Sequence, residues 1–154
     1  MTTFKAIGDD LLQSIDAALP SLTDIDERRA SQPGAPGKWS PKQVLGHLID
    51  SASNNHQRFV RAQQPGNLHL PGYVQDHWVR VQHYNGRPWS SLIELWAAYN
   101  RHLAHVIACI PESAQETTCS IDPYPAETLG FIASDYVVHL WHHLNQVGIA
   151  RPSA

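Results

Sequence analysis

The sequence predicts an all-α protein, a four-helix bundle with one extra short helix. Apolar residues recur at three- and four-residue spacing in four long segments, a period typical of amphipathic helices. The strict alternation of apolar and polar residues that marks a strand is weak throughout. With 154 residues, 42% of them hydrophobic and 16% charged, the chain also has the length and composition of a single globular domain spanning residues 1–154.

The strongest helix start is the segment that begins at Trp39. Ser40 can cap the helix, Pro41 suits the first helical position, and Gln43 completes a capping box. This helix should extend to about residue 64, where a Pro-Gly pair follows.

The other predicted helices follow from the same apolar period and from the turn residues around them. They cover residues 3–18, 73–84, 88–110 and 127–147. Ser91 and Glu94 have capping-box spacing at the start of the third of these, and Gly148 is placed to end the last. Long loops should precede the helix at Ser40 and the final helix, because 111–125 shows no helical period.

Charge and hydropathy exclude several classes of protein. The formal net charge is −3 and there is no basic tract, which argues against a nucleic-acid partner. No apolar run approaches the roughly 20 residues that cross a bilayer, and the first residues lack the pattern of a signal peptide. We therefore expect a soluble, cytoplasmic protein with no membrane partner.

The last predicted helix carries two histidines on its buried side. His139 and His143 lie about 40° apart at 100° per residue and both point into the bundle, whereas His142 points toward solvent. Two imidazoles at this i, i+4 spacing suit two adjacent ligands of one metal ion. The pattern alone is weak, because such pairs are common in a chain with 10 histidines.

The helix that follows Ser40 supplies a third histidine and a polar stripe. His47 lies at the edge of the apolar face, and the same side continues through Ser51, Asn54, Asn55 and Arg58. Polar groups beside a buried face are costly unless they line a wet cavity or pair internally. His47, His139 and His143 would make an open three-histidine site for one divalent metal ion, the pattern of catalytic sites. The alternative is three histidines that merely satisfy hydrogen bonds in a polar core.

Further side chains are candidates for roles around such a site. Arg58 is a candidate catalytic or substrate-binding residue that could fix an anionic group, although a surface cation is equally compatible with its position. Ser51, Asn54 and Asn55 are expected to bind substrate, as is Tyr73 in a possible lid. Asp50 or Asp76 could support a ligand from behind or act as a base. Asp50 suits a solvent-facing or supporting position, and Asp76, which follows Tyr73, is the candidate catalytic residue.

Two motifs in this order and spacing resemble the DinB-like/YfiT-like metal-binding four-helix bundle superfamily, and residues 47–59 followed by Pro71-Gly72-Tyr73 resemble an uncharacterised bacterial branch of it. The motifs are Trp39-Ser40 leading to His47, and His139-x-x-x-His143 near the C-terminus. The resemblance implies a bundle with up-down-down-up connectivity, a homodimer, and a metal site at His47, His139 and His143. It implies nickel or zinc as the metal, with iron or manganese also known in the family.

The resemblance leaves two classes of function open. One is a metal-dependent enzyme acting on a small molecule, either a hydrolase or a thiol-dependent S-transferase with a low-molecular-weight thiol as cosubstrate. The alternative is a non-enzymatic metal- or ligand-binding protein of the stress response. A titratable carboxylate close to the open side of the metal site would favour the enzyme.

Overall fold

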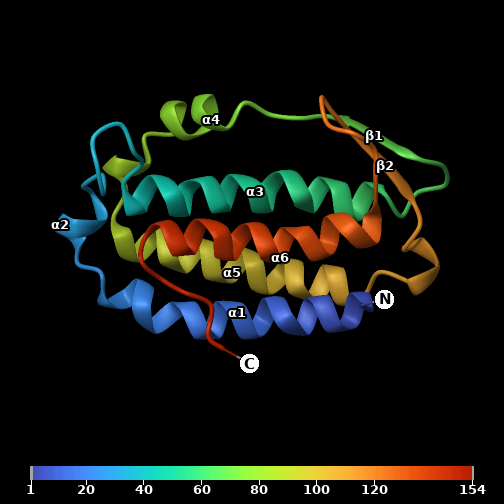
Figure 1. Ribbon diagram of the computed structural model, residues 1–154, viewed down its shortest axis with the longest axis horizontal. Coiled ribbons are helices and arrows are strands. Elements are labelled where there is room, and N and C mark those ends of the chain that lie inside the picture. The colour runs from blue at the N-terminus through green and yellow to red at the C-terminus, as the bar shows by residue number, and fades with distance from the viewer. Residues whose placement is uncertain (1, 154) are drawn as a thin grey trace.

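Four long helices form the body of the computed structural model, which describes residues 2–153. They are α1 (Phe4–Asp24), α3 (Pro41–Arg61), α5 (Trp89–Ala108) and α6 (Leu129–Gln146). Both α1 and α3 pack against α5 and α6. Followed from the N-terminus in Figure 1, α1 runs one way, α3 and α5 run back, and α6 runs parallel to α1. The order is therefore up-down-down-up, as the resemblance implied.

The capping box predicted for α3 is confirmed, and it fixes where His47 lies. The Ser40 hydroxyl accepts a hydrogen bond from the Gln43 amide at 3.2 Å, and the Gln43 side chain accepts one from the Ser40 amide at 2.9 Å. Pro41 occupies the first turn. His47 follows about two turns later, on the side of α3 that faces α6.

Helix α1 continues to Asp24, six residues beyond the predicted end at residue 18, although it contains Pro20. Proline removes one helical hydrogen bond, but Leu22 beyond it is fully buried, and its carbonyl accepts a hydrogen bond from the Trp89 indole at 2.9 Å. The burial of Leu22 and its hydrogen bond to Trp89 outweigh the helical hydrogen bond that is lost at Pro20.

The start of α5 differs from the prediction, because Ser91 is not its cap. The helix begins at Trp89, and no side chain of its N-cap residue binds the first turn. Glu27, in the short helix α2 (Glu27–Ala30), instead accepts a hydrogen bond from the Trp89 amide at 2.9 Å and pairs with the buried Lys42 of α3. A carboxylate from a distant segment thus replaces the local cap.

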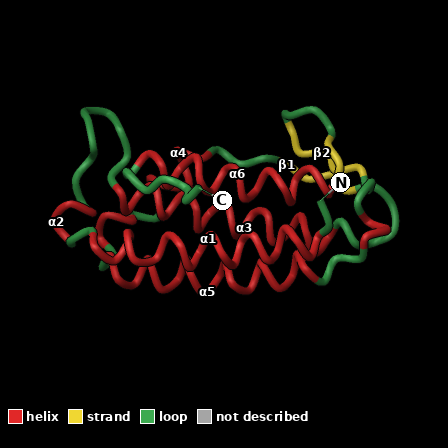
Figure 2. The backbone as a smooth tube through the Cα atoms, turned by 60° about the horizontal axis from the view of Figure 1, so that its bottom comes forward, coloured by secondary structure: helices red, strands yellow, loops and turns green. Residues whose placement is uncertain are grey.

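The chain is not strictly all-α, because three short strands form a sheet at one end of the bundle (Figure 2). Strand β1 (Leu68–Pro71) pairs in parallel with β2 (Thr118–Asp122), and β2 pairs antiparallel with β3 (Glu127–Thr128). Strands this short carry little periodicity, and β1 meets β2 across 50 residues of sequence. Helix α6 accordingly begins at Leu129 rather than Glu127, with Thr128 as its cap.

The connection between α3 and α5 lies along α3 (Figure 1). It contains β1, α4 (Gln75–Val81) within the predicted 73–84, and the 3-10 turn η1 (Tyr84–Gly86); a second such turn, η2 (Glu112–Ala114), follows α5. The Tyr84 ring packs so closely on Gly46 that a Cβ there would lie 2.2 Å from the ring. Within residues 2–153, no helix is long and apolar enough to cross a membrane.

Candidate metal centre

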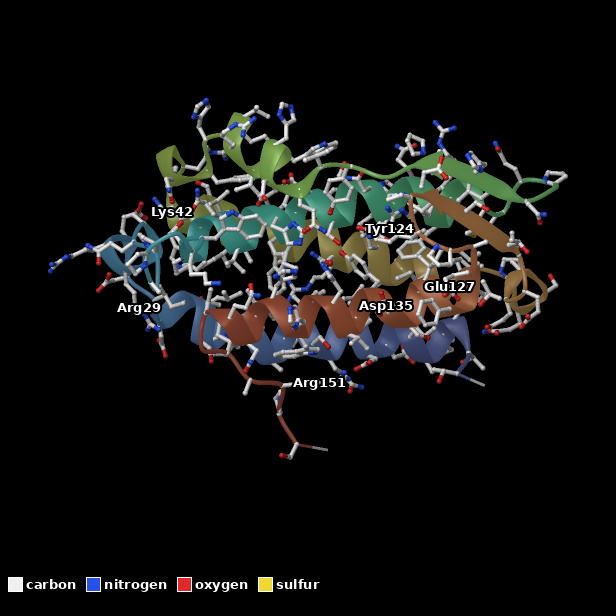
Figure 3. The ribbon with its side chains drawn as sticks, turned by 45° about the horizontal axis from the view of Figure 1, so that its top comes forward. Arg29, Lys42, Tyr124, Glu127, Asp135 and Arg151 are labelled. Carbon is white, nitrogen blue, oxygen red and sulfur yellow. The ribbon has the colours of Figure 1, made fainter. Side chains whose placement is uncertain are left out.

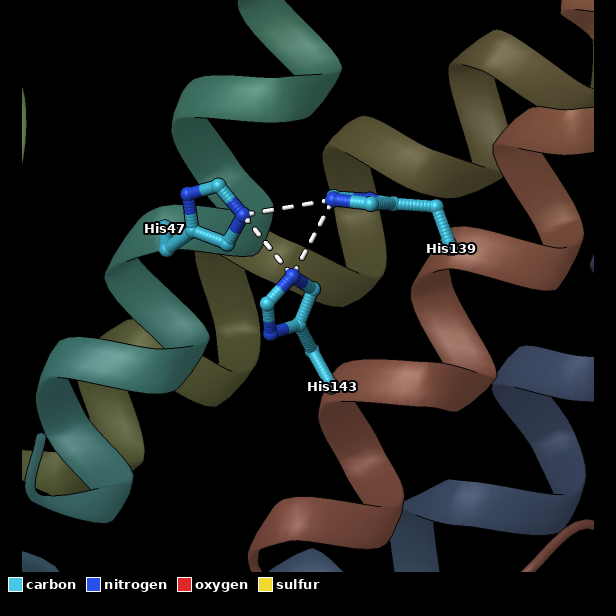
Figure 4. Close-up of side chains that lie close together, drawn as sticks. All are labelled: His47, His139 and His143. Carbon is cyan, nitrogen blue, oxygen red and sulfur yellow. Dashed lines mark hydrogen bonds between the residues drawn. The ribbon is translucent and has the colours of Figure 1, made fainter. Parts of the chain in front are cut away.

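The Nε2 atoms of three histidines converge between α3 and α6 (Figure 4). The distance from His47 is 3.1 Å to His143 and 3.4 Å to His139, and the two histidines of α6 are 3.1 Å apart. His142 is exposed, as its helical angle predicted. The structure therefore brings together the three residues that the sequence singled out.

The distances between these three nitrogens are compatible with one metal ion bound by all three. Two nitrogens that each lie about 2.0–2.1 Å from one zinc ion, at octahedral to tetrahedral angles, are about 2.9–3.4 Å apart. All three separations in the triad fall within this interval. All three donors are imidazole nitrogens, which bind zinc, nickel, iron and copper.

Mutual hydrogen bonding cannot account for the cluster. Each neutral imidazole Nε2 either carries a proton or offers a lone pair. Among three mutually adjacent Nε2 atoms, at least one pair must therefore consist of two donors or two acceptors. Three lone pairs directed at one cation satisfy every member of the cluster, which favours the metal site over a polar core.

The surroundings keep the triad neutral, as metal ligands must be. Burial, then the neighbouring His143 and His139, lower the pKa of His47 to about 3. Burial, then His143, His142 and Arg58, lower the pKa of His139 to about 4. The pKa of His143 is also lowered, mainly by burial.

Two residues that were not among the predicted site residues support the triad from outside the cleft. The Trp39 ring packs on His47, with 5.1 Å between ring centroids, and lies 6.5 Å from that of His143. Gln146 Oε1 accepts a hydrogen bond from His143 Nδ1 at 2.9 Å. Gln146 follows His143 by three residues on the same helix, and this spacing could have predicted the contact between them.

A cleft of about 400 Å³ reaches the triad from the other side, at His139. Four of the five residues predicted to bind substrate line it: Ser51, Asn55, Arg58 and Tyr73. Aromatic side chains from the turn between β2 and β3 and from α6 complete much of the wall, namely Tyr124, Phe131 and Tyr136.

Arg58 is the cation of this cleft. Its Nη1 donates to Asn55 Oδ1 at 3.3 Å, and the Asn55 amide in turn donates to the Ser51 carbonyl at 2.9 Å. No carboxylate in residues 2–153 lies within ion-pair distance of Arg58. Burial lowers the pKa of its guanidinium. Arg58 is thus a half-buried charge, held in place but not neutralised.

Asn54 and Asp76 are not brought into the cleft. Both line a separate depression beside α4, and Asp76 is exposed there. The Asn54 side chain donates to the Asp50 carbonyl at 2.9 Å, within its own helix. Their proposed roles in substrate binding and catalysis stay predictions.

Two other carboxylates, Glu127 and Asp135, line the cleft (Figure 3). Asp135 lies one turn before His139 on α6, so an Asp-x-x-x-His-x-x-x-His spacing places the carboxylate and both histidines along one side of the helix. This spacing was visible in the sequence, but Asp135 is exposed and the pattern of polar residues on α6 did not single it out.

Comparison with known proteins agrees with this architecture. A protein of Bacillus mycoides (strain KBAB4), named "Putative metal-dependent hydrolase", is 25% identical over 146 residues, covering 92% of this chain and 82% of that protein. A protein of the same name from Bacillus cereus (strain B4264) is 28% identical over 61 residues, only 35% of its length.

A solved structure has the same fold. YfiT from Bacillus subtilis, described as "a probable metal-dependent hydrolase with an unusual four-helix bundle topology", superposes with a TM-score of 0.73 at 18% identity. The match covers 94% of this chain and 79% of YfiT. The sequence profile of the DinB superfamily matches residues 10–147, nearly the whole length described here. The chain belongs to the DinB superfamily.

Proposed function

We propose that the protein is a metal-dependent hydrolase whose single divalent ion, zinc or nickel, is held by His47, His139 and His143. The observation that carries the proposal is the convergence of three Nε2 atoms at ligand spacing, two from buried histidines and one from the partly buried His139, open on one side to a cleft. When bound, such an ion acts as a Lewis acid and lowers the pKa of a coordinated water. The names of the relatives favour hydrolysis over thiol transfer.

The residues of the cleft provide binding and proton transfer around the ion. Arg58 offers free guanidinium N–H groups to an anionic group of the substrate, and Asn55 orients that guanidinium. Tyr73 and Tyr124 give the substrate body an aromatic wall. Asp135 can accept or return a proton at its carboxylate, since it lines the same cleft one turn from His139.

The proposed substrate is therefore a small molecule with an anionic group, an apolar body and a hydrolysable bond. A suitable first pair of probes is mono-p-nitrophenyl glutarate, which has a free carboxylate, and neutral p-nitrophenyl acetate. Protein loaded with zinc or nickel should hydrolyse the glutarate ester with the higher kcat/KM.

His142→Ala and His143→Ala form a matched pair, because the two histidines are adjacent and only His143 belongs to the triad. The proposal requires His142→Ala to keep the activity and His143→Ala to lose it. Equal activity in both variants, or activity that survives complete chelation, would refute a metal-dependent reaction at this site.

A further inference from the structure

The outward nitrogen of His47 is a buried polar atom without a partner. Its Nδ1 has no hydrogen bond among the described residues, and the side chain is completely buried. Figure 4 shows this nitrogen on the side of the ring that faces away from His139 and His143. When Nε2 is the ligand atom of a neutral imidazole, Nδ1 carries the proton. A buried N–H without an acceptor destabilises the folded protein, so we expect a hydrogen-bond acceptor near this nitrogen.

Asp50 presents the complementary unpartnered atom. Its Oδ2 is buried without a hydrogen bond, and only 2% of the residue is exposed. Its Oδ1, in contrast, accepts hydrogen bonds from the Tyr84 hydroxyl at 2.6 Å and from the Gln82 amide at 2.7 Å. The carboxylate is therefore held at one oxygen, while the other is available to a donor.

The backbone places these two atoms on neighbouring turns. Asp50 follows His47 by three residues on α3, so the two side chains lie on adjacent parts of the helix surface. Helical side chains lean toward the N-terminus, which directs the Asp50 carboxylate back to the turn that carries His47. The position of Tyr84 supports this direction of the Asp50 side chain, because the Tyr84 ring packs on Gly46 while its hydroxyl binds Asp50.

We propose that Asp50 is a positioning residue of the metal centre: its Oδ2 accepts the Nδ1 proton of His47 through one buried water. This contact holds the Nε2 lone pair of His47 toward His139 and His143. A carboxylate behind a ligand histidine also raises the basicity of that ligand. The metal-binding consequence rests on the proposed function, whereas the tautomer of His47 is a property of the metal-free chain.

The substitution Asp50→Asn tests the contact because it nearly preserves shape. If the Asn oxygen keeps the hydrogen bonds from Tyr84 and Gln82, its amide donor replaces Oδ2 and faces His47 Nδ1. His47 then accepts at Nδ1 and carries its proton on Nε2, which blocks the ligand atom. Tyr84→Phe is the control, since it removes a hydrogen bond from Oδ1 and leaves Oδ2 in place.

The experiment combines ¹⁵N NMR of the histidine side chains in metal-free protein at pH 7.5 with zinc affinity from chelator competition. The parent should have His47 protonated on Nδ1. Asp50→Asn should move the proton to Nε2 and weaken zinc binding about 10- to 100-fold. Tyr84→Phe should lower the Tm yet keep the parental tautomer and affinity.

The parent spectrum alone can overturn the proposal, without any variant, if His47 is protonated on Nε2. An Asp50→Asn protein with the parental tautomer and zinc affinity would overturn it as well. If the parent binds no zinc but His47 is protonated on Nδ1 and responds to Asp50→Asn, the positioning contact stands and the metal-dependent function fails.

Discussion

Gln146 Oε1 and His143 Nδ1 are joined by a hydrogen bond of 2.9 Å within the last turn of α6. Because an amide oxygen only accepts, His143 must carry its proton on Nδ1, and its Nε2 lone pair faces the triad. Gln146→Ala should therefore weaken zinc binding about tenfold, the lower end of the range for such supporting contacts. Chelator competition measures the effect, with Asn145→Ala, an exposed neighbour, as control. Equal zinc affinity in both variants would contradict this role.

Arg58 should determine the preference for anionic substrates. Arg58→Met removes the cation from the cleft, and a lost charge-assisted hydrogen bond of about 1.5–3 kcal/mol corresponds to a 10- to 150-fold loss in kcat/KM for mono-p-nitrophenyl glutarate. The rate with p-nitrophenyl acetate should change little. Arg61→Met is the matched control, because Arg61 is exposed and binds Gln57 outside the cleft. A parallel loss with both esters would show that Arg58 does not recognise the anion.

Several features of the fold and site follow from local sequence, and others do not. The capping box at Ser40 and the inward angles of His139 and His143 depend on residues a few positions apart, so both could be predicted. The sheet and the Glu27 cap of α5 join segments that are distant in the chain, and local periodicity does not report such pairing. The cleft forms where the turn at Tyr124 meets α3 and α6. Because local sequence does not predict that meeting, Asp135 was not recognised as a residue of the cleft.

The homodimer stays a prediction.

The metal-free protein should lose stability as the pH falls below 6.5. Because burial depresses the folded-state pKa of His47 to about 3 and of His139 to about 4, the unfolded chain, with histidine pKa values near 6.5, binds protons first. The stabilisation is thus present above pH 6.5 and declines toward pH 4, by about 1.4 kcal/mol per pH unit for each such histidine.

Urea unfolding of metal-free protein between pH 8 and pH 5 measures this slope. His47→Gln should make the decline shallower, whereas His105→Ala, at an exposed position on α5 away from the triad, should leave the slope unchanged. A free energy of unfolding that stays constant from pH 7 to pH 5 would contradict the buried, neutral triad.

Gly46 should not tolerate a side chain. A Cβ at this position would lie 2.2 Å from the Tyr84 ring, so Gly46→Ala must displace the segment that holds Asp50. Such overpacking costs about 1–3 kcal/mol, which thermal or urea unfolding would detect. Gly86→Ala is the control, because nothing lies within 4 Å of a Cβ there. If both variants unfold at the same temperature, the close packing of the connection on α3 is wrong.

If His47, His139 and His143 hold one divalent ion, the metal content of the purified protein should depend on His143. Untagged parent, His142→Ala and His143→Ala would each be incubated with zinc, nickel, iron or manganese, desalted, and measured by inductively coupled plasma mass spectrometry. We expect about one equivalent of zinc or nickel per chain in the parent and in His142→Ala, and almost none in His143→Ala. A parent that retains none of these metals, or a His143→Ala variant that retains as much as the parent, would contradict a metal site at these three histidines.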